Sequence, residues 1–207
     1  YDWNDKGFVD ASKVKLINEG KYSENIIEKW VMNDGIWYYY LGEKYAVGLK
    51  CIDGYWYYFN QNGEMQIGWQ KIDGKWYYFR PDGNMRIGWE EINGYWYYFN
   101  EDGVMQTGWQ EIGGKWYYFR PDGNMRIDWE EINGYWYYFG SDGVMQTGWQ
   151  ELGGKWYYFR SDGNMRIGWE KINSCWYYFN GDGVMLTGTQ KIDGVIYNFK
   201  DNGMLIE

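Results

Sequence analysis

Short aromatic runs recur along most of this chain every twenty residues, separated by polar turn residues. In one such unit, the run from Trp69 to Ile72 is followed by Asp73-Gly74 and then by the run from Trp76 to Phe79. Asp-Gly, Asn-Gly and Gly-Gly accept the positive φ angles of a type I′ turn, the two-residue connection that matches the twist of paired strands. The pattern therefore predicts one β-hairpin per unit.

Two tryptophan positions mark the repeat. The later position is occupied by Trp56, Trp76, Trp96, Trp116, Trp136, Trp156 and Trp176, and by Ile196 in the last unit. The earlier position is occupied by Trp69, Trp89, Trp109, Trp129, Trp149 and Trp169, with Leu49 before them and Thr189 after them. In a degenerate unit ahead of these, Trp30 and Trp37 keep the same spacing. A fixed period of this length is typical of a solenoid, in which each unit contacts only its neighbours.

Alternation along a strand should place Trp76 and Tyr78 on one face of the hairpin and Tyr77 and Phe79 on the other. Because a single hairpin is only marginally stable in water, we expect the hairpins to stack and to bury aromatic faces against one another. Tyr77, Phe79 and Ile72 are our candidates for the core. The predicted fold is an all-β solenoid of stacked hairpins with a repeat of twenty residues.

The period does not extend to residues 1–29, which we expect to be a linker, a cap or a remnant of an upstream domain. Residues 30–207 should form the repeat solenoid, with degenerate first (30–48) and last (188–207) units. The chain starts at Tyr1, without Met or signal peptide, and is therefore expected to be a segment of a longer protein. Within the solenoid two unit types alternate, giving a longer period of forty residues. Either two kinds of site or duplication of a two-unit block would produce this alternation.

Composition and charge narrow the function. The chain has 16 Trp, 24 Tyr, no His and a formal net charge of −9. The negative charge disfavours nucleic-acid binding, which needs basic patches, and is consistent with solubility or with a preference for cationic ligands. Without histidine there is no histidine base and no Ser-His triad, so we predict no enzymatic activity, no cofactor and no metal site in this segment. There is no apolar run long enough for a membrane span. Cys51 and Cys175 lie in distant repeats and are expected to be free thiols.

The unit GW-x4-G-x-WYYF-x3-G-x-M-x2-GW resembles the choline-binding repeat, also called the cell-wall-binding repeat, of streptococcal and clostridial surface proteins and phage lysins. The similarity covers roughly residues 28 to 207. It implies that the hairpins form a left-handed superhelix and that choline is bound between consecutive hairpins, in a cage of aromatic rings with a methionine nearby.

The resemblance also implies which residues form the cages. Trp69 and Trp76 should line one cage, and we expect Tyr98 of the next hairpin to be its third wall. The full predicted set is Trp69, Trp76, Trp89, Trp96, Trp109, Trp116, Trp129, Trp136, Trp149, Trp156, Trp169, Trp176, Tyr98, Tyr118, Tyr138, Tyr158, Tyr178, Met85, Met105, Met125, Met145 and Met165.

Physical chemistry supports such a cage, because a trimethylammonium group is cationic but cannot donate an N–H hydrogen bond. Facing π clouds and apolar contact are what remain to hold it. We therefore predict a non-catalytic extracellular module that anchors a surface protein or phage lysin to choline or phosphocholine on wall teichoic or lipoteichoic acid; homodimerisation stays open. The alternative is a module that binds glucan or host glycans, and a purely structural spacer is a third possibility, although a spacer has no need for paired tryptophans.

Overall fold

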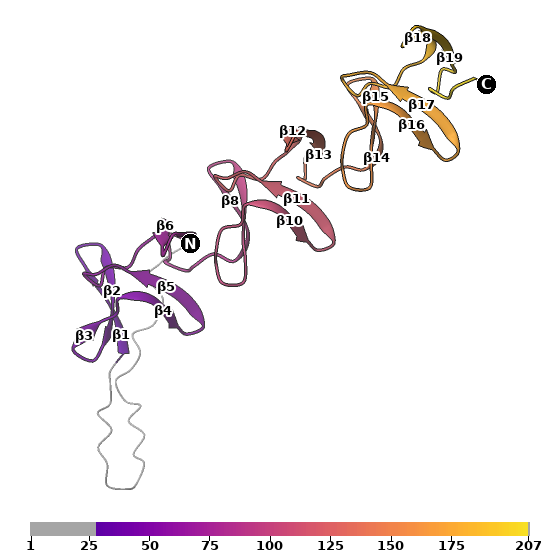
Figure 1. Ribbon diagram of the computed structural model, residues 1–207. Coiled ribbons are helices and arrows are strands. Elements are labelled where there is room, and N and C mark those ends of the chain that lie inside the picture. The colour runs from indigo at the N-terminus through magenta and orange to yellow at the C-terminus, as the bar shows by residue number, and fades with distance from the viewer. Residues whose placement is uncertain (1–27, 207) are drawn as a thin grey trace, which may run out of the picture. The chain divides into compact units, whose positions relative to one another are not determined.

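The computed structural model describes residues 28–206, and in this part of the chain it contains nineteen β-strands and no helix (Figure 1). No helix that could cross a membrane is therefore found between residues 28 and 206. The predicted linker or cap falls almost entirely outside the described residues. Its boundary with the solenoid stays a prediction.

The first three strands form one antiparallel sheet and the others form eight two-stranded hairpins. The sheet contains β1 (Glu28–Asn33), β2 (Ile36–Leu41) and β3 (Lys44–Tyr45). The hairpins are β4 (Gly48–Ile52) with β5 (Tyr55–Phe59), β6 (Gly68–Ile72) with β7 (Lys75–Phe79), β8 (Gly88–Ile92) with β9 (Tyr95–Phe99), β10 (Gly108–Ile112) with β11 (Lys115–Phe119), β12 (Asp128–Ile132) with β13 (Tyr135–Phe139), β14 (Gly148–Leu152) with β15 (Lys155–Phe159), β16 (Gly168–Ile172) with β17 (Cys175–Phe179), and β18 (Gly188–Ile192) with β19 (Val195–Phe199). The hairpins predicted from the sequence are confirmed.

The chain divides into two compact units. The first contains the three-stranded sheet and Phe59–Met65, and the second contains Leu49–Tyr58 and the chain from Gln66 onward. In the first unit, the Trp30 ring packs on Tyr39 and Phe59, at centroid distances of 5.0 and 5.8 Å. The candidate site described below lies wholly in the second unit.

The hairpin turns have the predicted conformation. Asp73 and Gly74 both have positive φ, 49° and 79°, as a type I′ turn requires, and the equivalent pairs in the other hairpins do the same. Asn173-Ser174 also adopts this turn, with Ser174 at a φ of 69°. A serine pays a steric penalty in this region that glycine does not.

Stacking of successive hairpins uses both faces of each hairpin. In the β6–β7 register, Trp69 is paired with Tyr78, so both lie on one face, and Tyr77 and Phe79 lie on the other. The Trp69 face packs on the next hairpin. The centroid of the Trp69 ring lies 5.7 Å from that of Phe99, which is fully buried. Tyr77 and Phe79 are 8% and 0% exposed, which confirms them as core residues.

The isoleucine of the core varies between hairpins. Ile72 is only half-buried, whereas its counterparts Ile92, Ile132 and Ile172 are buried. The all-β stacked-hairpin fold is thus as predicted, and the hand of the superhelix stays a prediction.

Backbone hydrogen bonds join each loop to the hairpin before its own. Met105, in the loop after β9, donates its N–H to the carbonyl of Trp76 at 2.8 Å. Its side chain lies against Gly123 in the following loop, where an added Cβ would be 2.3 Å from the Met105 sulfur. A glycine is needed there both for its φ of 85° and for this close approach.

Replacing Ser174 by Gly should stabilise the protein, because the folded chain then no longer holds a Cβ in the left-handed region. We expect a gain of about 0.5–1 kcal/mol, seen as a higher urea midpoint. The matched control is Ser161→Gly, since Ser161 has no positive φ and the substitution only adds freedom to the unfolded chain. A gain in the control equal to that of Ser174→Gly would contradict the explanation.

Candidate ligand-binding site

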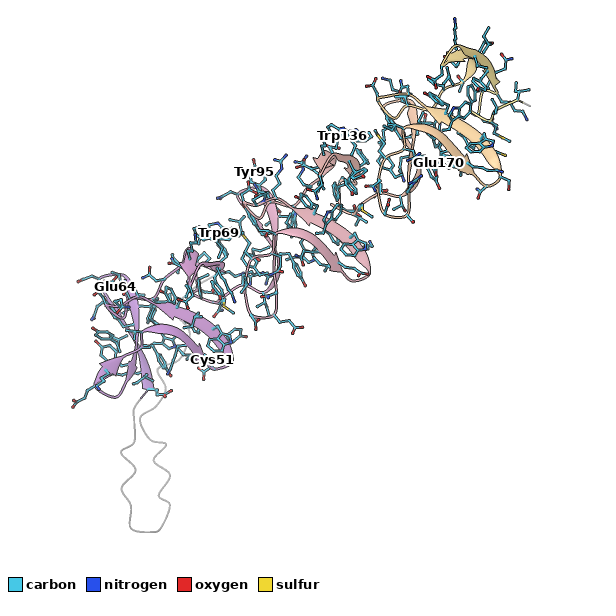
Figure 2. The ribbon with its side chains drawn as sticks, viewed as in Figure 1. Cys51, Glu64, Trp69, Tyr95, Trp136 and Glu170 are labelled. Atoms are coloured by element: carbon cyan, nitrogen blue, oxygen red, sulfur yellow. The ribbon has the colours of Figure 1, made fainter. Side chains whose placement is uncertain are left out.

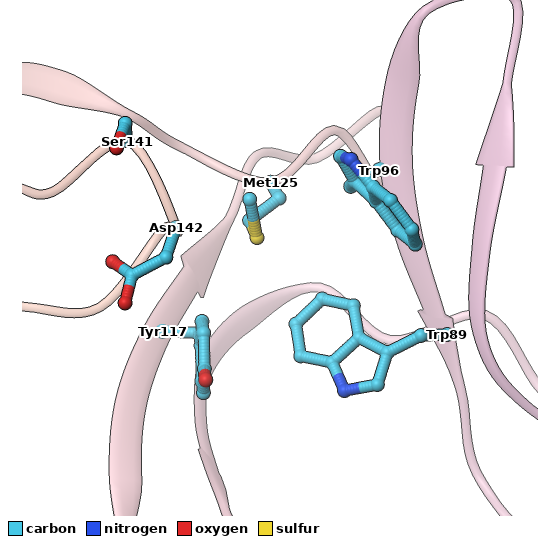
Figure 3. A pocket seen from close by; sticks show the side chains of 6 residues that line it. All are labelled: Trp89, Trp96, Tyr117, Met125, Ser141 and Asp142. Atoms are coloured by element: carbon cyan, nitrogen blue, oxygen red, sulfur yellow. The ribbon is translucent and has the colours of Figure 1, made fainter.

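An open groove of about 280 Å³ lies beside the β8–β9 hairpin (Figure 3). Its walls are the indoles of Trp89 and Trp96, the phenol ring of Tyr117 and the thioether of Met125. Ser141 and Asp142 complete the lining. In Figure 3 the Met125 sulfur faces the space between the rings, while the Asp142 carboxylate points away from the two indoles. The space is therefore bounded mainly by π faces and sulfur.

Two successive hairpins and two loops build this groove. Trp89 and Trp96 are on β8 and β9, Tyr117 is on β11 of the next hairpin, and Met125 is in the loop that follows it. The Met125 N–H donates to the Trp96 carbonyl at 2.9 Å, which fixes the loop against the indole. Asp142 lies in the loop that follows β13. Gly143 of the same loop lies against the Met125 side chain.

The two indoles have different roles. Trp89 is half-buried because it packs on Tyr117 and Phe119, at centroid distances of 5.0 and 5.7 Å. Trp96 stands across from it at 6.3 Å with an interplanar angle of 76°, and remains 43% exposed. A ring whose only role was in the core would bury more of its surface, so the open face of Trp96 is available to a ligand.

The same arrangement recurs in six hairpins of the second unit. The two indoles of each hairpin stand 6.2–6.3 Å apart in the pairs Trp69–Trp76, Trp89–Trp96, Trp109–Trp116, Trp129–Trp136, Trp149–Trp156 and Trp169–Trp176. The earlier indole of each pair contacts a tyrosine of the next hairpin at 4.9–5.0 Å, in the order Tyr97, Tyr117, Tyr137, Tyr157, Tyr177 and Tyr197. We call each such group of two indoles and one phenol ring a cage. Figure 2 marks Trp69 and Trp136, which belong to two of these cages.

The tyrosine that meets the earlier indole is not the Tyr98 predicted from the sequence. Tyr98 does not meet Trp69; the ring that does is Tyr97. The face that carries Trp96 and Tyr98 packs on the following hairpin. The tyrosine that meets Trp69 of the preceding hairpin therefore comes from the opposite face, which carries Tyr97. Tyr98 instead pairs with Trp89 of its own hairpin, at 5.1 Å. The other four predicted tyrosines, Tyr118, Tyr138, Tyr158 and Tyr178, likewise lie 5.1–5.2 Å from the earlier tryptophan of their own hairpin.

The methionines are displaced by one unit from the predicted set. Met105, Met125, Met145 and Met165 donate their N–H groups to Trp76, Trp96, Trp116 and Trp136, and so accompany complete cages. Met85 is bonded instead to Trp56, whose partner position holds Leu49 and which therefore lacks a second indole. Met185, bonded to Trp156, was missed by the sequence analysis, although its loop has the same pattern.

The last cage has leucine in the methionine position. Trp169, Trp176 and Leu205 line an open groove of about 360 Å³, and the Leu205 N–H donates to the Trp176 carbonyl. In the final hairpin Thr189 and Ile196 replace both indoles, so no cage forms there.

A family model of the choline-binding repeat matches residues 46–87, 86–128, 126–167 and 166–206. The chain belongs to the choline-binding repeat family. No curated protein matches it.

Solved structures of pneumococcal proteins are similar. Choline binding protein F from Streptococcus pneumoniae, solved in the presence of a peptidoglycan analogue, superposes with a TM-score of 0.77 at 36% identity, over 83% of this chain and 61% of that one. CbpJ from Streptococcus pneumoniae TIGR4 gives a TM-score of 0.69 at 28% identity, over 86% of this chain and 94% of that one. The modular autolysin LytC from the same species gives 0.63 at 29% identity, over 86% of this chain and 42% of LytC.

Carboxylates lie near the cages of these choline-binding repeats. The pKa of Tyr97 is raised first by burial and then by the charge of Asp122, and the pKa of Tyr137 is raised in the same way by burial and Asp162. Both phenols are neutral at physiological pH. The nearby negative charge favours a cationic ligand over a neutral one.

Every second junction also contains an ion cluster. Glu90 accepts hydrogen bonds from Arg80 Nε at 3.1 Å and from Arg80 Nη2 at 2.8 Å, and Arg86 Nε lies 2.7 Å from it. The same cluster recurs forty residues later around Glu130 and again around Glu170, with Arg120, Arg126, Arg160 and Arg166. Thus the longer period of the sequence corresponds to two kinds of junction in the structure.

Between residues 28 and 206, no three His, Cys, Asp or Glu side chains are grouped so that they could bind a metal ion. Cys51 and Cys175 are free thiols, as the sequence analysis expected.

Replacing Glu90 by Gln should lower the urea midpoint at neutral pH by an amount equivalent to about 1 kcal/mol, because both arginines lose a charged partner. The hydrogen bonds from Arg80 hold the pKa of Glu90 below its ordinary value. Its contribution to stability is therefore present above that ordinary value and is lost as the pH falls through the lowered pKa. Consequently the difference between the two proteins should shrink in acid.

The control for this test is Glu91→Gln, which alters the exposed neighbouring residue. It should leave the midpoint nearly unchanged. Equal effects of the two substitutions, or an effect of Glu90→Gln that persists in strong acid, would contradict a role for the ion cluster.

Proposed function

We propose that this chain is a multivalent anchoring module whose aromatic cages bind choline groups of teichoic or lipoteichoic acid on a bacterial wall. The observation that carries the proposal is the cage itself, with two indoles nearly perpendicular to each other, a phenol ring from the next hairpin and, in five of six copies, a methionine. Membership of the choline-binding repeat family supports the same ligand.

The lining suits a quaternary ammonium ion. Such an ion cannot donate N–H hydrogen bonds, so it gains most from π faces and from polarizable sulfur. A sugar would need several hydrogen-bonding side chains around its hydroxyl groups. Besides the Tyr117 hydroxyl and the indole N–H groups, two polar side chains line the groove beside Trp96, Ser141 and Asp142, and Asp142 Oδ1 already accepts the Val144 N–H at 3.1 Å.

Repetition compensates for weak single sites. A ligand as small as choline has few atoms and so binds one cage weakly, with a dissociation constant on the order of millimolar. A wall polymer offers many choline groups, and each contact after the first is intramolecular, which raises avidity by about 10² to 10⁴ where the geometry permits. Six cages in the second unit alone fit this use. The module itself carries no catalytic role in this proposal, and its attachment to a wall hydrolase, as the autolysin LytC illustrates, belongs to the proposal as well.

Disabling one cage should remove one site. We expect calorimetric titration with choline to give about one site fewer per chain for Trp116→Ala than for the unaltered protein. Trp116 is 42% exposed, so its loss should affect binding more than folding. Since repeats contact only their neighbours, the remaining sites should keep their affinity.

The matched control is Trp56→Ala. Trp56 occupies the equivalent position and is 46% exposed, but Leu49 replaces its partner indole. This variant should bind the same number of choline molecules as the parent. Dextran added to the titration should not compete. Loss of a site in both variants, loss of all sites in either, or displacement of choline by dextran would contradict the proposal, and the last result would favour a carbohydrate ligand.

A further inference from the structure

The six cages differ in the charge of one neighbouring residue. In each hairpin the residue directly paired with the exposed tryptophan lies on the same face of the sheet as the cage, and we call it the facing residue. The facing residues are Lys71, Glu91, Glu111, Glu131, Glu151 and Lys171, paired with Trp76, Trp96, Trp116, Trp136, Trp156 and Trp176. All six are exposed. The outer two cages therefore have a cationic neighbour and the inner four an anionic one.

The lysines contact the indoles. Lys71 Nζ lies over the Trp76 ring at 5.7 Å from its centroid, and Lys171 Nζ lies over Trp176 at 5.8 Å. These distances are within the range of cation–π attraction. A second cation that approaches the same indole must share the π electrons of the ring with the lysine ammonium. The two positive charges also repel each other. A bare quaternary ammonium should thus bind less well at these two indoles than at the four that face a glutamate.

A phosphodiester reverses this preference. In a phosphocholine group a negative phosphate is linked to the ammonium by two carbons, so it stays close to the cage when the ammonium is inside. An exposed lysine beside the cage can pair with that phosphate, whereas a glutamate at the same position repels it. The charge of the facing residue therefore acts oppositely on the two ligands.

We propose that the facing residue sorts the cages into two classes, with Lys71 and Lys171 selecting phosphocholine diesters and the four glutamates favouring the bare choline cation. This inference rests on the proposed function, because it concerns the same cages. It assigns a role to residues outside the aromatic walls.

Two charge variants of the full chain test the proposal. One carries Lys71→Glu and Lys171→Glu, so that all six facing residues are glutamate. The other carries Glu91→Lys, Glu111→Lys, Glu131→Lys and Glu151→Lys, so that all six are lysine. Calorimetry with choline and with glycerophosphocholine gives the ratio of the two dissociation constants. At low ionic strength the ratio should shift toward glycerophosphocholine by about three- to ten-fold from the all-glutamate to the all-lysine protein, and less in high salt.

A control separates local from net charge. Lys75 and Lys155 are exposed but pair with Ile72 and Leu152, on the opposite face of their hairpins. The double variant Lys75→Glu with Lys155→Glu has the same net charge as the all-glutamate protein and should keep the parent ratio. An equal shift in this control would overturn the proposal.

The remaining outcomes distinguish this proposal from the proposed function. If the parent binds choline but the ratio is the same in both facing variants, the sorting is wrong and the cages stand. If the parent binds neither ligand, both ideas fail. Wall polymer and phosphatidylcholine vesicles carry the same diester, so retention of the two variants is measured on each. Stronger retention of the all-lysine protein on choline-bearing walls supports the wall polymer as the source of the diester. A difference between the two variants that is confined to vesicles would overturn this assignment.

Discussion

The packing of each hairpin's earlier tryptophan on the next hairpin is the interaction on which the rest of the structure depends. Trp89 lies between its own Tyr98 and the Tyr117 and Phe119 of the following hairpin, and Phe119 is fully buried as a result. A two-stranded hairpin cannot bury enough apolar surface alone. With few aliphatic residues available, aromatic contact between neighbours replaces a conventional core, and it must be renewed at every repeat.

The binding site results from this packing of one hairpin on the next. Trp89 is half-buried against the next hairpin, whereas Trp96 keeps one open face, with Tyr117 and Met125 held beside it. A ligand in the cage contacts two hairpins and a loop at once. Binding should therefore favour the stacked arrangement of neighbouring repeats, because only that arrangement assembles the cage. Where Leu49 replaces the earlier indole, the stack continues but the cage is incomplete.

The sequence predicted most of the fold because its signals were local. The turn dipeptides fixed the hairpins, and alternation correctly placed Tyr77 and Phe79 in the core. The incorrect predictions concerned contacts between one repeat and the next. Alternation distinguishes the two faces of a hairpin but does not say which face meets the previous unit, and so Tyr98 was chosen over Tyr97. Met185 was missed although its loop repeats the pattern of the others, because the sequence does not show which hairpin a loop packs against. The ion cluster around Glu90 depends on the conformation of the loop that holds Arg80 and Arg86, which their spacing does not reveal.

The central claim is that the ligand site is the open face of the later tryptophan, enclosed by the tyrosine of the next hairpin. A crystal structure of this chain grown with choline tests it most directly. The account predicts trimethylammonium density against Trp76, Trp96, Trp116, Trp136, Trp156 and Trp176, each facing its cage tyrosine, and none beside Leu49. Choline bound on other surfaces while these cages remain empty, or bound beside Leu49 as fully as at the six cages, would contradict it.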